Sequence, residues 1–290
     1  MKLKAKFNVV ILAIFSVGLL VTGYLSFTIL HANARKDAVE RATLVMEAAT
    51  AIQAYTQLEV EPLLAPHMGE NFLPQSVAAY AAIQALNKMG DNSSDYSYKA
   101  AVLNPTNPRD KAFEWEAEVV EAFRADPSVK KVEGVRPTTH GDSLYLARPI
   151  KITNKACLVC HGDPEKAPKA LLKKYGPANG FGWKVNEIVG AQIVSVPLTG
   201  SLQEARLAFV VIMGLLVVMF ATFIIVLNAM LKSIVISPAT TMSKIADQVS
   251  KGDLEVPAFD VGGTDEMATL AGSFNRMRRS VERAMRMLDK

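Results

Sequence analysis

The sequence of 290 residues has little cysteine, little histidine, and two long stretches without any charged side chain. It contains 2 cysteines and 4 histidines. A structural zinc site needs four ligands, and no second cysteine pair exists to complete one. The sequence also lacks a basic patch interleaved with aromatic side chains, so nucleic acid is not an expected partner.

The two uncharged stretches are residues 7–30 and residues 207–231. A helix needs roughly 20 apolar residues to cross the hydrocarbon core of a membrane, and both stretches exceed that length. A cleaved signal peptide is the alternative for the first, but its apolar run is longer than the usual 7–15 residues of such peptides. A buried core helix is the alternative for the second. Both stretches are therefore predicted to be transmembrane helices.

The short flanks of these helices predict the orientation of the chain. Lys2, Lys4 and Lys6 precede the first helix without an acidic residue among them, and such positive flanks stay in the cytoplasm. The prediction is a two-pass protein of the bacterial cytoplasmic (inner) membrane with a periplasmic domain. Its expected segments are a cytoplasmic N-terminus (1–6), a first membrane helix (7–30), the periplasmic domain (31–206), a second membrane helix (207–231) and a cytoplasmic domain (232–290).

The only two cysteines, Cys157 and Cys160, stand directly before His161 in a C-x-x-C-H pattern. This is the attachment pattern of c-type haem. Two thiols one helical turn apart can each add to one vinyl group of the porphyrin, and the following imidazole can bind the iron as the proximal ligand. A thioredoxin-like pair would need a βαβ context, and a plain disulfide would leave the histidine without a role. One covalent haem c is the expected cofactor, and its place outside the cytoplasm agrees with the predicted topology.

The sixth iron ligand is less constrained by the sequence. The candidates are His31, His67, His140, Met46, Met68 and Met89. Met46 lies on an expected helix over residues 37–59, in a stripe of mostly small side chains that would leave room for a flat ring: Ala42, Ala49, Thr50 and Gln53. Ordinary core packing of Met46 is the alternative.

Periodicity predicts an α+β fold for the external domain. The expected helices are residues 31–60, ended by Pro62 and Pro66, then 74–89 and 110–124, the last with Phe113, Val120 and Phe123 facing inward. The expected strands are residues 96–103, 129–135, 143–150 and 188–197. A small sheet with flanking helices has about the dimensions of a PAS domain.

Several longer runs make the domain similar to one family. They include Glu61–Leu64, Phe72–Val77, Leu103–Arg109, Leu144–Ile150, Cys157–His161, Asn179–Trp183 and Val189–Pro197. The domain resembles the single-haem c-type domains with a PAS-like fold, long catalogued as a domain of unknown function and typified by a cyanobacterial cytochrome. The resemblance implies haem on Cys157 and Cys160, His161 as one axial ligand, and a sulfur ligand from the first helix. That sulfur is a cysteine in the typifying member, and Met46 falls at about its place here.

The C-terminal segment has two amphipathic helices joined by a connector with Gly252-Asp253. The first carries Met242, Ile245 and Val249, and the second carries a heptad seam of Met267, Leu270, Phe274, Met277, Val281, Ala284 and Leu288. This region resembles a HAMP domain, which implies a homodimer. No kinase, cyclase or methyl-accepting segment follows, so we expect the output on a separate cytoplasmic signalling protein, or a truncated product.

The leading hypothesis is a transmembrane redox or gas sensor that relays the state of the haem through HAMP. A redox partner or a diatomic gas would be its input. The alternative is a membrane-anchored electron-transfer cytochrome. A haem enzyme is not expected, because no pair of acid–base residues is placed around the motif.

Overall fold

The computed structural model describes residues 3–67, 71–92, 96–139, 141–253, 255–259 and 262–288. The chain divides into two compact units, each described here by itself. One unit is residues 26–209, and the other joins residues 1–25 with residues 210–290.

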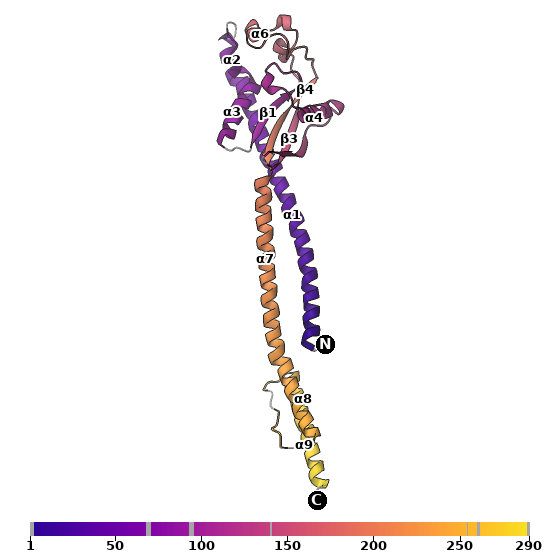
Figure 1. Ribbon diagram of the computed structural model, residues 1–290. Helices are drawn as coiled ribbons and strands as arrows, with labels where there is room; N and C mark the ends of the chain where they lie inside the picture. The colour runs from indigo at the N-terminus through magenta and orange to yellow at the C-terminus, as the bar shows by residue number, and fades with distance from the viewer. Residues whose placement is uncertain are drawn as a thin grey trace. The chain divides into compact units, whose positions relative to one another are not determined.

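The unit of residues 26–209 is built on one antiparallel sheet (Figure 1). Its strands are β1 (Ser97–Val102), β2 (Val132–Thr138), β3 (Gly141–Lys151) and β4 (Ile188–Pro197). Their spatial order is β1-β4-β3-β2, so the last strand in sequence lies inside the sheet. The predicted strands 96–103, 143–150 and 188–197 are confirmed, and the strand predicted at 129–135 begins three residues later than expected.

Helices pack on both faces of this sheet. In Figure 1, α1 (Leu3–Tyr55) and α3 (Ala78–Asn92) lie on one side of it and α4 (Glu114–Ala125) on the other. The first face buries a cluster that includes Ala38, Ala42, Met46, Ala49, Ile83, Leu86, Tyr98, Leu144, Leu146, Val194 and Val196. The opposite face buries Ala101, Val119, Val120, Phe123, Ala147, Ile188, Ala191 and Ile193. Residues of β3 and β4 alternate between the two clusters because successive side chains of a strand point to opposite faces.

Helix α4 begins later than the sequence predicts, and this changes the position of Phe113. Phe113 is the residue before the helix, and its backbone N–H donates to the Glu116 carboxylate at 2.8 Å. Val120 and Phe123 are fully buried, as predicted, whereas Phe113 is 64% exposed. The inward position predicted for Phe113 is wrong because the helical periodicity starts only after it.

The long first helix does not end before Pro62. A π-helical turn, η1 (Thr56–Val60), follows α1 and leads into α2 (Glu61–Leu64) and a 3₁₀ turn, η2 (Ala65–His67). Pro62 lies in the first turn of α2, where its missing N–H removes no intrahelical hydrogen bond. The remaining short helices are η3 (Pro74–Ser76), η4 (Pro108–Asp110), α5 (Cys157–His161), η5 (Pro164–Lys166) and α6 (Lys169–Tyr175).

Two helices are long and apolar enough to cross a membrane. They correspond to the N-terminal part of α1 and to α7 (Thr199–Met230). Within the second unit the two helices are in contact, since Phe15 stacks on Phe220 with ring centroids 4.3 Å apart. A membrane can cover the exposed apolar side chains along both helices.

The C-terminal part of the second unit is helical. It comprises a π-helical turn, η6 (Leu231–Ile236), followed by α8 (Ser237–Ser250) and α9 (Glu266–Leu288). Met242, Phe259 and Ala271 form its small core. The Asn275 side chain accepts from the Phe259 N–H at 3.0 Å and donates to the Phe259 carbonyl at 2.5 Å, which fixes the connector against α9. Other residues of the predicted seam, Leu270, Met277 and Val281, are exposed in the single chain.

Candidate haem-binding site

The C-x-x-C-H residues form the short helix α5, which follows strand β3 after a short connecting segment. Asn154 starts this helix, since its side chain accepts from the Ala156 N–H at 2.9 Å and its carbonyl accepts from the Cys157 N–H at 3.2 Å. Cys157 and Cys160 are both free thiols and half-buried. The spacing of three residues places them on neighbouring turns of one helix face.

The site is anchored to the sheet through a third apolar cluster. Val102, Ile152 and Val189 are its buried members, and Cys157, Leu158 and Trp183 pack against them. The cluster lies where β1 ends, β3 ends and β4 begins, so the sheet fixes the base of the α5 helix.

The imidazole of His161 is held in one orientation by its surroundings. Its Nδ1 lies 2.8 Å from the Gly180 carbonyl oxygen and 3.3 Å from the Thr106 hydroxyl. Its ring stacks on Trp183 with a centroid distance of 4.0 Å and an angle of 11° between planes. Because a carbonyl oxygen only accepts, Nδ1 carries the proton and Nε2 keeps its lone pair. A histidine that binds a metal through one nitrogen usually donates from the other in this way.

The loop that supplies Gly180 is tied to the helix at several points. The Gly182 N–H donates to the Gly162 carbonyl at 2.8 Å, and the Trp183 N–H donates to the His161 carbonyl at 3.1 Å. Gly180 has a φ of +82°, and a Cβ on it would lie 2.0 Å from the Thr106 hydroxyl oxygen. Only glycine fits there, because the backbone is left-handed and the space is already filled.

Both the imidazole and the second thiol are neutral groups near pH 7. Burial lowers the pKa of His161, against the opposite effect of its bond to the Gly180 carbonyl. Burial raises the pKa of the Cys160 thiol, and the charges of Glu61 and Cys157 raise it further. The influence of Glu61 shows that the start of α2 lies near Cys160. A neutral imidazole is the form that binds iron.

Apolar side chains on the helical segment around Glu61 are exposed. Tyr55, Leu58 and Leu63 are 63%, 71% and 74% exposed, and Val159 of the C-x-x-C-H helix is 61% exposed. The segment includes the π-helical turn η1, a type of irregularity that is frequent at functional sites. The thiols, the oriented imidazole and this uncovered apolar surface together fit a covalently attached porphyrin.

Met46 lies elsewhere in the domain. Its side chain is fully buried in the cluster between α1 and the sheet, with Leu146 and Val194. Cys157 belongs to the third cluster, and Ile150 packs against both clusters. No described contact joins Met46 to His161, so its role as an iron ligand stays a prediction. Thr50 of the expected stripe is exposed.

No described contact joins the other candidate ligands to His161 either. His31 lies against Phe27, with ring centroids 4.2 Å apart, and His67 and Met89 are exposed. His140 and Met68 lie outside the described residues. The sequence did not single out Thr106, Gly180 or Trp183 as partners of His161. The only signals for them were two of the runs that carry the family resemblance, Leu103–Arg109 for Thr106 and Asn179–Trp183 for Gly180 and Trp183.

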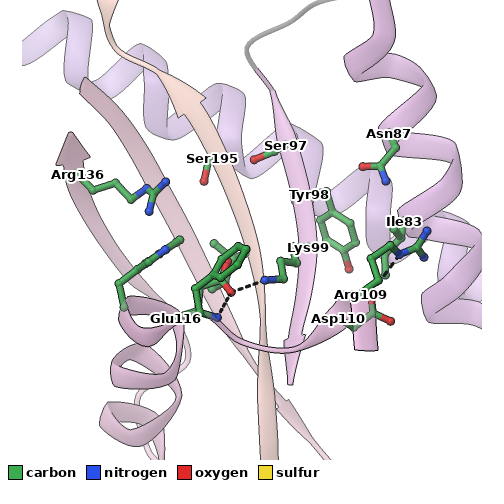
Figure 2. Close-up of a pocket in the computed structure, with 13 residues that line it drawn as sticks. Ile83, Asn87, Ser97, Tyr98, Lys99, Arg109, Asp110, Glu116, Arg136 and Ser195 are labelled. Carbon is green, nitrogen blue, oxygen red and sulfur yellow. Dashed lines mark hydrogen bonds and ion pairs between the residues drawn. The ribbon is translucent and has the colours of Figure 1, made fainter. Parts of the chain in front are cut away.

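A second group of polar side chains lines a cavity of about 320 Å³ between α4 and the sheet. Figure 2 shows Arg136, Ser195, Ser97, Lys99 and Glu116 around this space. Burial raises the pKa of Asp110, also in its lining, against the opposing charge of Arg109.

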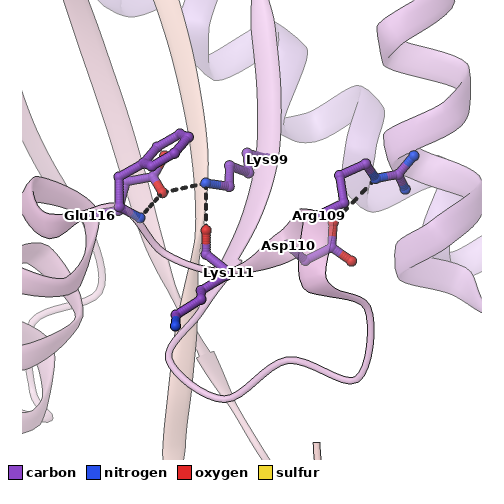
Figure 3. A network of polar contacts seen from close by, with 6 residues as sticks. Lys99, Arg109, Asp110, Lys111 and Glu116 are labelled. Carbon is purple, nitrogen blue, oxygen red and sulfur yellow. Dashed lines mark hydrogen bonds and ion pairs between the residues drawn. The ribbon is translucent and has the colours of Figure 1, made fainter. Parts of the chain in front are cut away.

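An ion pair forms one wall of this cavity. Lys99 Nζ donates to the Glu116 carboxylate at 2.6 Å and to the Lys111 carbonyl at 2.8 Å (Figure 3). The ammonium group also lies 3.7 Å from the centroid of the Phe113 ring. Since Glu116 is only 3% exposed and also accepts from the Phe113 N–H, this pair caps the start of α4 and connects it to β1.

Comparison with known proteins gives matches for two separate parts of the chain. Residues 31–197 match the Tll0287-like family, and residues 230–283 match the HAMP domain. No curated protein matches the chain. A solved structure described as the cyanobacterial heme-protein Tll0287 is similar at 15% identity and a TM-score of 0.44, over 56% of this chain and 95% of that chain.

A Tll0287-like domain followed by HAMP, with two helices among the described residues able to cross a membrane, fits a receptor in signal transduction. The family match covers more than half of the 290 residues and includes the C-x-x-C-H helix with the loop that orients His161. The chain therefore belongs to the Tll0287-like family, with a HAMP domain after the Tll0287-like domain.

Proposed function

We propose that this protein is a transmembrane sensor whose external domain carries one covalent haem c. The observation that carries the proposal is the hydrogen bond between His161 Nδ1 and the Gly180 carbonyl, next to two free thiols at the attachment spacing. It leaves Nε2 free for the iron and fixes the plane of the ring. The haem, when bound, supplies an iron whose oxidation state or gas ligand can change.

Cys157 and Cys160 attach the porphyrin in this proposal. Each S–H adds across one vinyl group: the sulfur bonds to one carbon and the hydrogen goes to the other, so no leaving group or oxidant is needed. The exposed Tyr55, Leu58 and Leu63 supply apolar surface that the ring can cover.

Met46 remains the proposed sixth ligand, and a conservative variant tests it. Met46→Leu removes the sulfur at nearly constant volume, which costs less than about 1.5 kcal/mol when a methionine only fills a core. Loss of the long-wavelength sulfur-to-iron absorption band and a large shift in reduction potential would support ligation. An unchanged spectrum would leave Met46 as core packing, the role that its burial between α1 and the sheet favours.

The fold and placement that we propose are those of a PAS-like domain in the periplasm. The antiparallel sheet, with helices on both faces, is consistent with the PAS-like class. Both termini are placed in the cytoplasm, and the two membrane helices in the bacterial inner membrane. Protease treatment of spheroplasts tests this, because it should cleave the haem domain and spare the HAMP domain.

The HAMP domain passes the signal on as a homodimer in this proposal. The exposed side chains of Leu270, Met277 and Val281 lie on α9, where a second copy can cover them. A separate cytoplasmic signalling protein would read the packing of that bundle. A change in the haem state can switch the bundle only if it favours one helix packing over the other by a few kcal/mol.

The test is an optical spectrum of the purified protein, oxidised and reduced, with and without carbon monoxide and nitric oxide. A c-type spectrum that responds to gas supports gas sensing, and one indifferent to gas supports redox sensing or electron transfer. His161→Ala should keep the covalent haem but lose the low-spin spectrum. Absence of covalent haem from the wild-type protein matured in a c-type assembly strain would refute the proposal.

A further inference from the structure

The cavity between α4 and the sheet contains one cation, Arg136, for which the described residues provide no ion pair. Arg136 lies on β2, and its guanidinium stacks over Trp115 with a carbon-to-centroid distance of 4.2 Å. Its Nε is buried and has no hydrogen-bond partner among the described residues. A buried N–H without an acceptor is costly, and such groups are rare unless a water, an ion or a ligand satisfies them.

The other charges that line the cavity already have partners. Lys99 pairs with Glu116 at 2.6 Å, and Arg109 lies 3.6 Å from the Asp110 carboxylate. Three cations and two acidic groups line the space, which leaves an excess of one positive charge. The excess is centred on Arg136, so a single negative charge would complete the site.

Two hydroxyl groups reach the same space from the sheet. Ser97 and Ser195 are paired residues on neighbouring strands β1 and β4. Arg136 pairs with Ser143, and Ser143 pairs with Pro197, so the arginine lies on the same face of the sheet as Ser195. Figure 2 shows the two serines and Arg136 around one opening. Hydroxyl donors next to a guanidinium are a common setting for a carboxylate.

Apart from Asn87 and Tyr98, the remaining surface of the cavity is apolar. Ile193 forms part of its floor, and the rings of Phe113 and Trp115 form part of its wall. The volume of about 320 Å³ is at the small end of the range for ligand pockets. An inorganic anion would leave this apolar surface uncovered, whereas a carboxylate with an apolar body would cover it.

We propose that this cavity binds a small organic monocarboxylate, with its carboxylate on Arg136 and the two serine hydroxyls and its apolar body against Ile193 and Trp115. The ligand is distinct from the haem, and the inference does not depend on the proposed haem chemistry. The external domain would then have a second input, on the face of the sheet covered by α4.

Calorimetric titration of the full-length protein in detergent tests the proposal, with sodium benzoate as the probe. Benzyl alcohol is the uncharged control, and sodium sulfate is the control without an apolar body. We expect saturable binding of benzoate, with at least about tenfold weaker binding of both controls, a ratio that corresponds to one lost charged contact. Equal binding of sulfate or of benzyl alcohol would refute the carboxylate assignment, and so would absence of benzoate binding at about 10 mM.

Variants locate the binding. Arg136→Gln should weaken benzoate binding at least about tenfold, and Ser195→Ala should weaken it by a few-fold. The matched control is Arg148→Gln, since Arg148 belongs to the same sheet but pairs with Glu47 on α1. Should Arg136→Gln fail to fold, as judged by its thermal unfolding, Ser195→Ala and Arg136→Lys provide the comparison. Unchanged affinity in the folded cavity variants, or equal loss in Arg148→Gln, would place the ligand elsewhere.

Discussion

Replacement of Gly180 by alanine tests the geometry that orients His161. A Cβ at this position would lie 2.0 Å from the Thr106 hydroxyl oxygen, 2.6 Å from its backbone nitrogen and 2.7 Å from its Cα. Rotation of the threonine side chain relieves only the first contact, so the backbone must move. Gly182 is the matched control, because its φ of +78° is nearly the same as the +82° of Gly180 and nothing lies within 4 Å of its Cβ position.

The structure gives different costs for the two variants. Gly182→Ala has only the left-handed backbone strain, about 1 kcal/mol. Gly180→Ala has the same strain, about 1–3 kcal/mol of overpacking, and the loss of about 1 kcal/mol from the hydrogen bond to His161. The expected totals are about 1 kcal/mol and about 3–5 kcal/mol, which lower the midpoint of thermal unfolding by roughly 2–4 °C and roughly 6–20 °C.

Circular dichroism of the two purified variants measures these midpoints. In the haem-loaded protein, Gly180→Ala should also raise the reduction potential, because His161 loses the acceptor that makes its imidazole a stronger donor. Gly182→Ala should leave the potential close to that of the wild type. Equal midpoints for the two variants would mean that the close approach of Gly180 to Thr106 is wrong.

Three further predictions concern other parts of the chain. Burial raises the pKa of Tyr98 to about 12, whereas the unfolded chain has the ordinary value of about 10. The free energy of unfolding should therefore be constant below pH 10 and fall by roughly 2–3 kcal/mol as the pH rises to 12. Denaturation of Tyr98→Phe should show no such loss of stability. Glu116→Ala should destabilise the domain by about 2–4 kcal/mol in urea denaturation, since the capping bond and the partner of Lys99 disappear together. Glu116→Gln should lose less stability than Glu116→Ala. Asn275→Asp should loosen the connector by about 1–3 kcal/mol, seen as faster proteolysis near Phe259, because the carboxylate cannot donate to the Phe259 carbonyl. Asn275→Ala, which loses both bonds, should loosen the connector at least as much.

The sequence was sufficient where the relevant residues are close together in the chain. Cys157, Cys160 and His161 lie within five residues, so their spacing alone predicted two thiols one helical turn apart with the imidazole directly after them. The partners of the imidazole are 55 and 19 residues away, at Thr106 and Gly180. Such contacts depend on the conformation of the loops that pack against the helix, and hydrophobic periodicity gives no information about that conformation.

The ends of elements show the same distinction. Alternating side chains identified strands β1, β3 and β4, because a half-buried strand repeats every two residues. The amphipathic pattern of the helix expected at residues 110–124 put Phe113 in the core, although Phe113 precedes the first turn of α4. Likewise, Pro62 was expected to end the first helix, whereas a π-helical turn before it lets the chain continue. Local hydrogen bonds determine where these helices begin and end, and the spacing of apolar residues does not predict those hydrogen bonds.

The position of strand β4 inside the sheet sets an order for the maturation of the domain during synthesis. Strands β2 and β3 are neighbours in sequence and can pair as a hairpin as soon as both are free to fold. Strand β1 is made earlier but pairs only with β4, which ends at Pro197, and helix α7 begins at Thr199. The nascent domain therefore exposes open strand edges, which promote aggregation, until the last strand arrives. The last strand of the sheet and α7, a helix able to cross a membrane, are therefore made within the same short interval of synthesis.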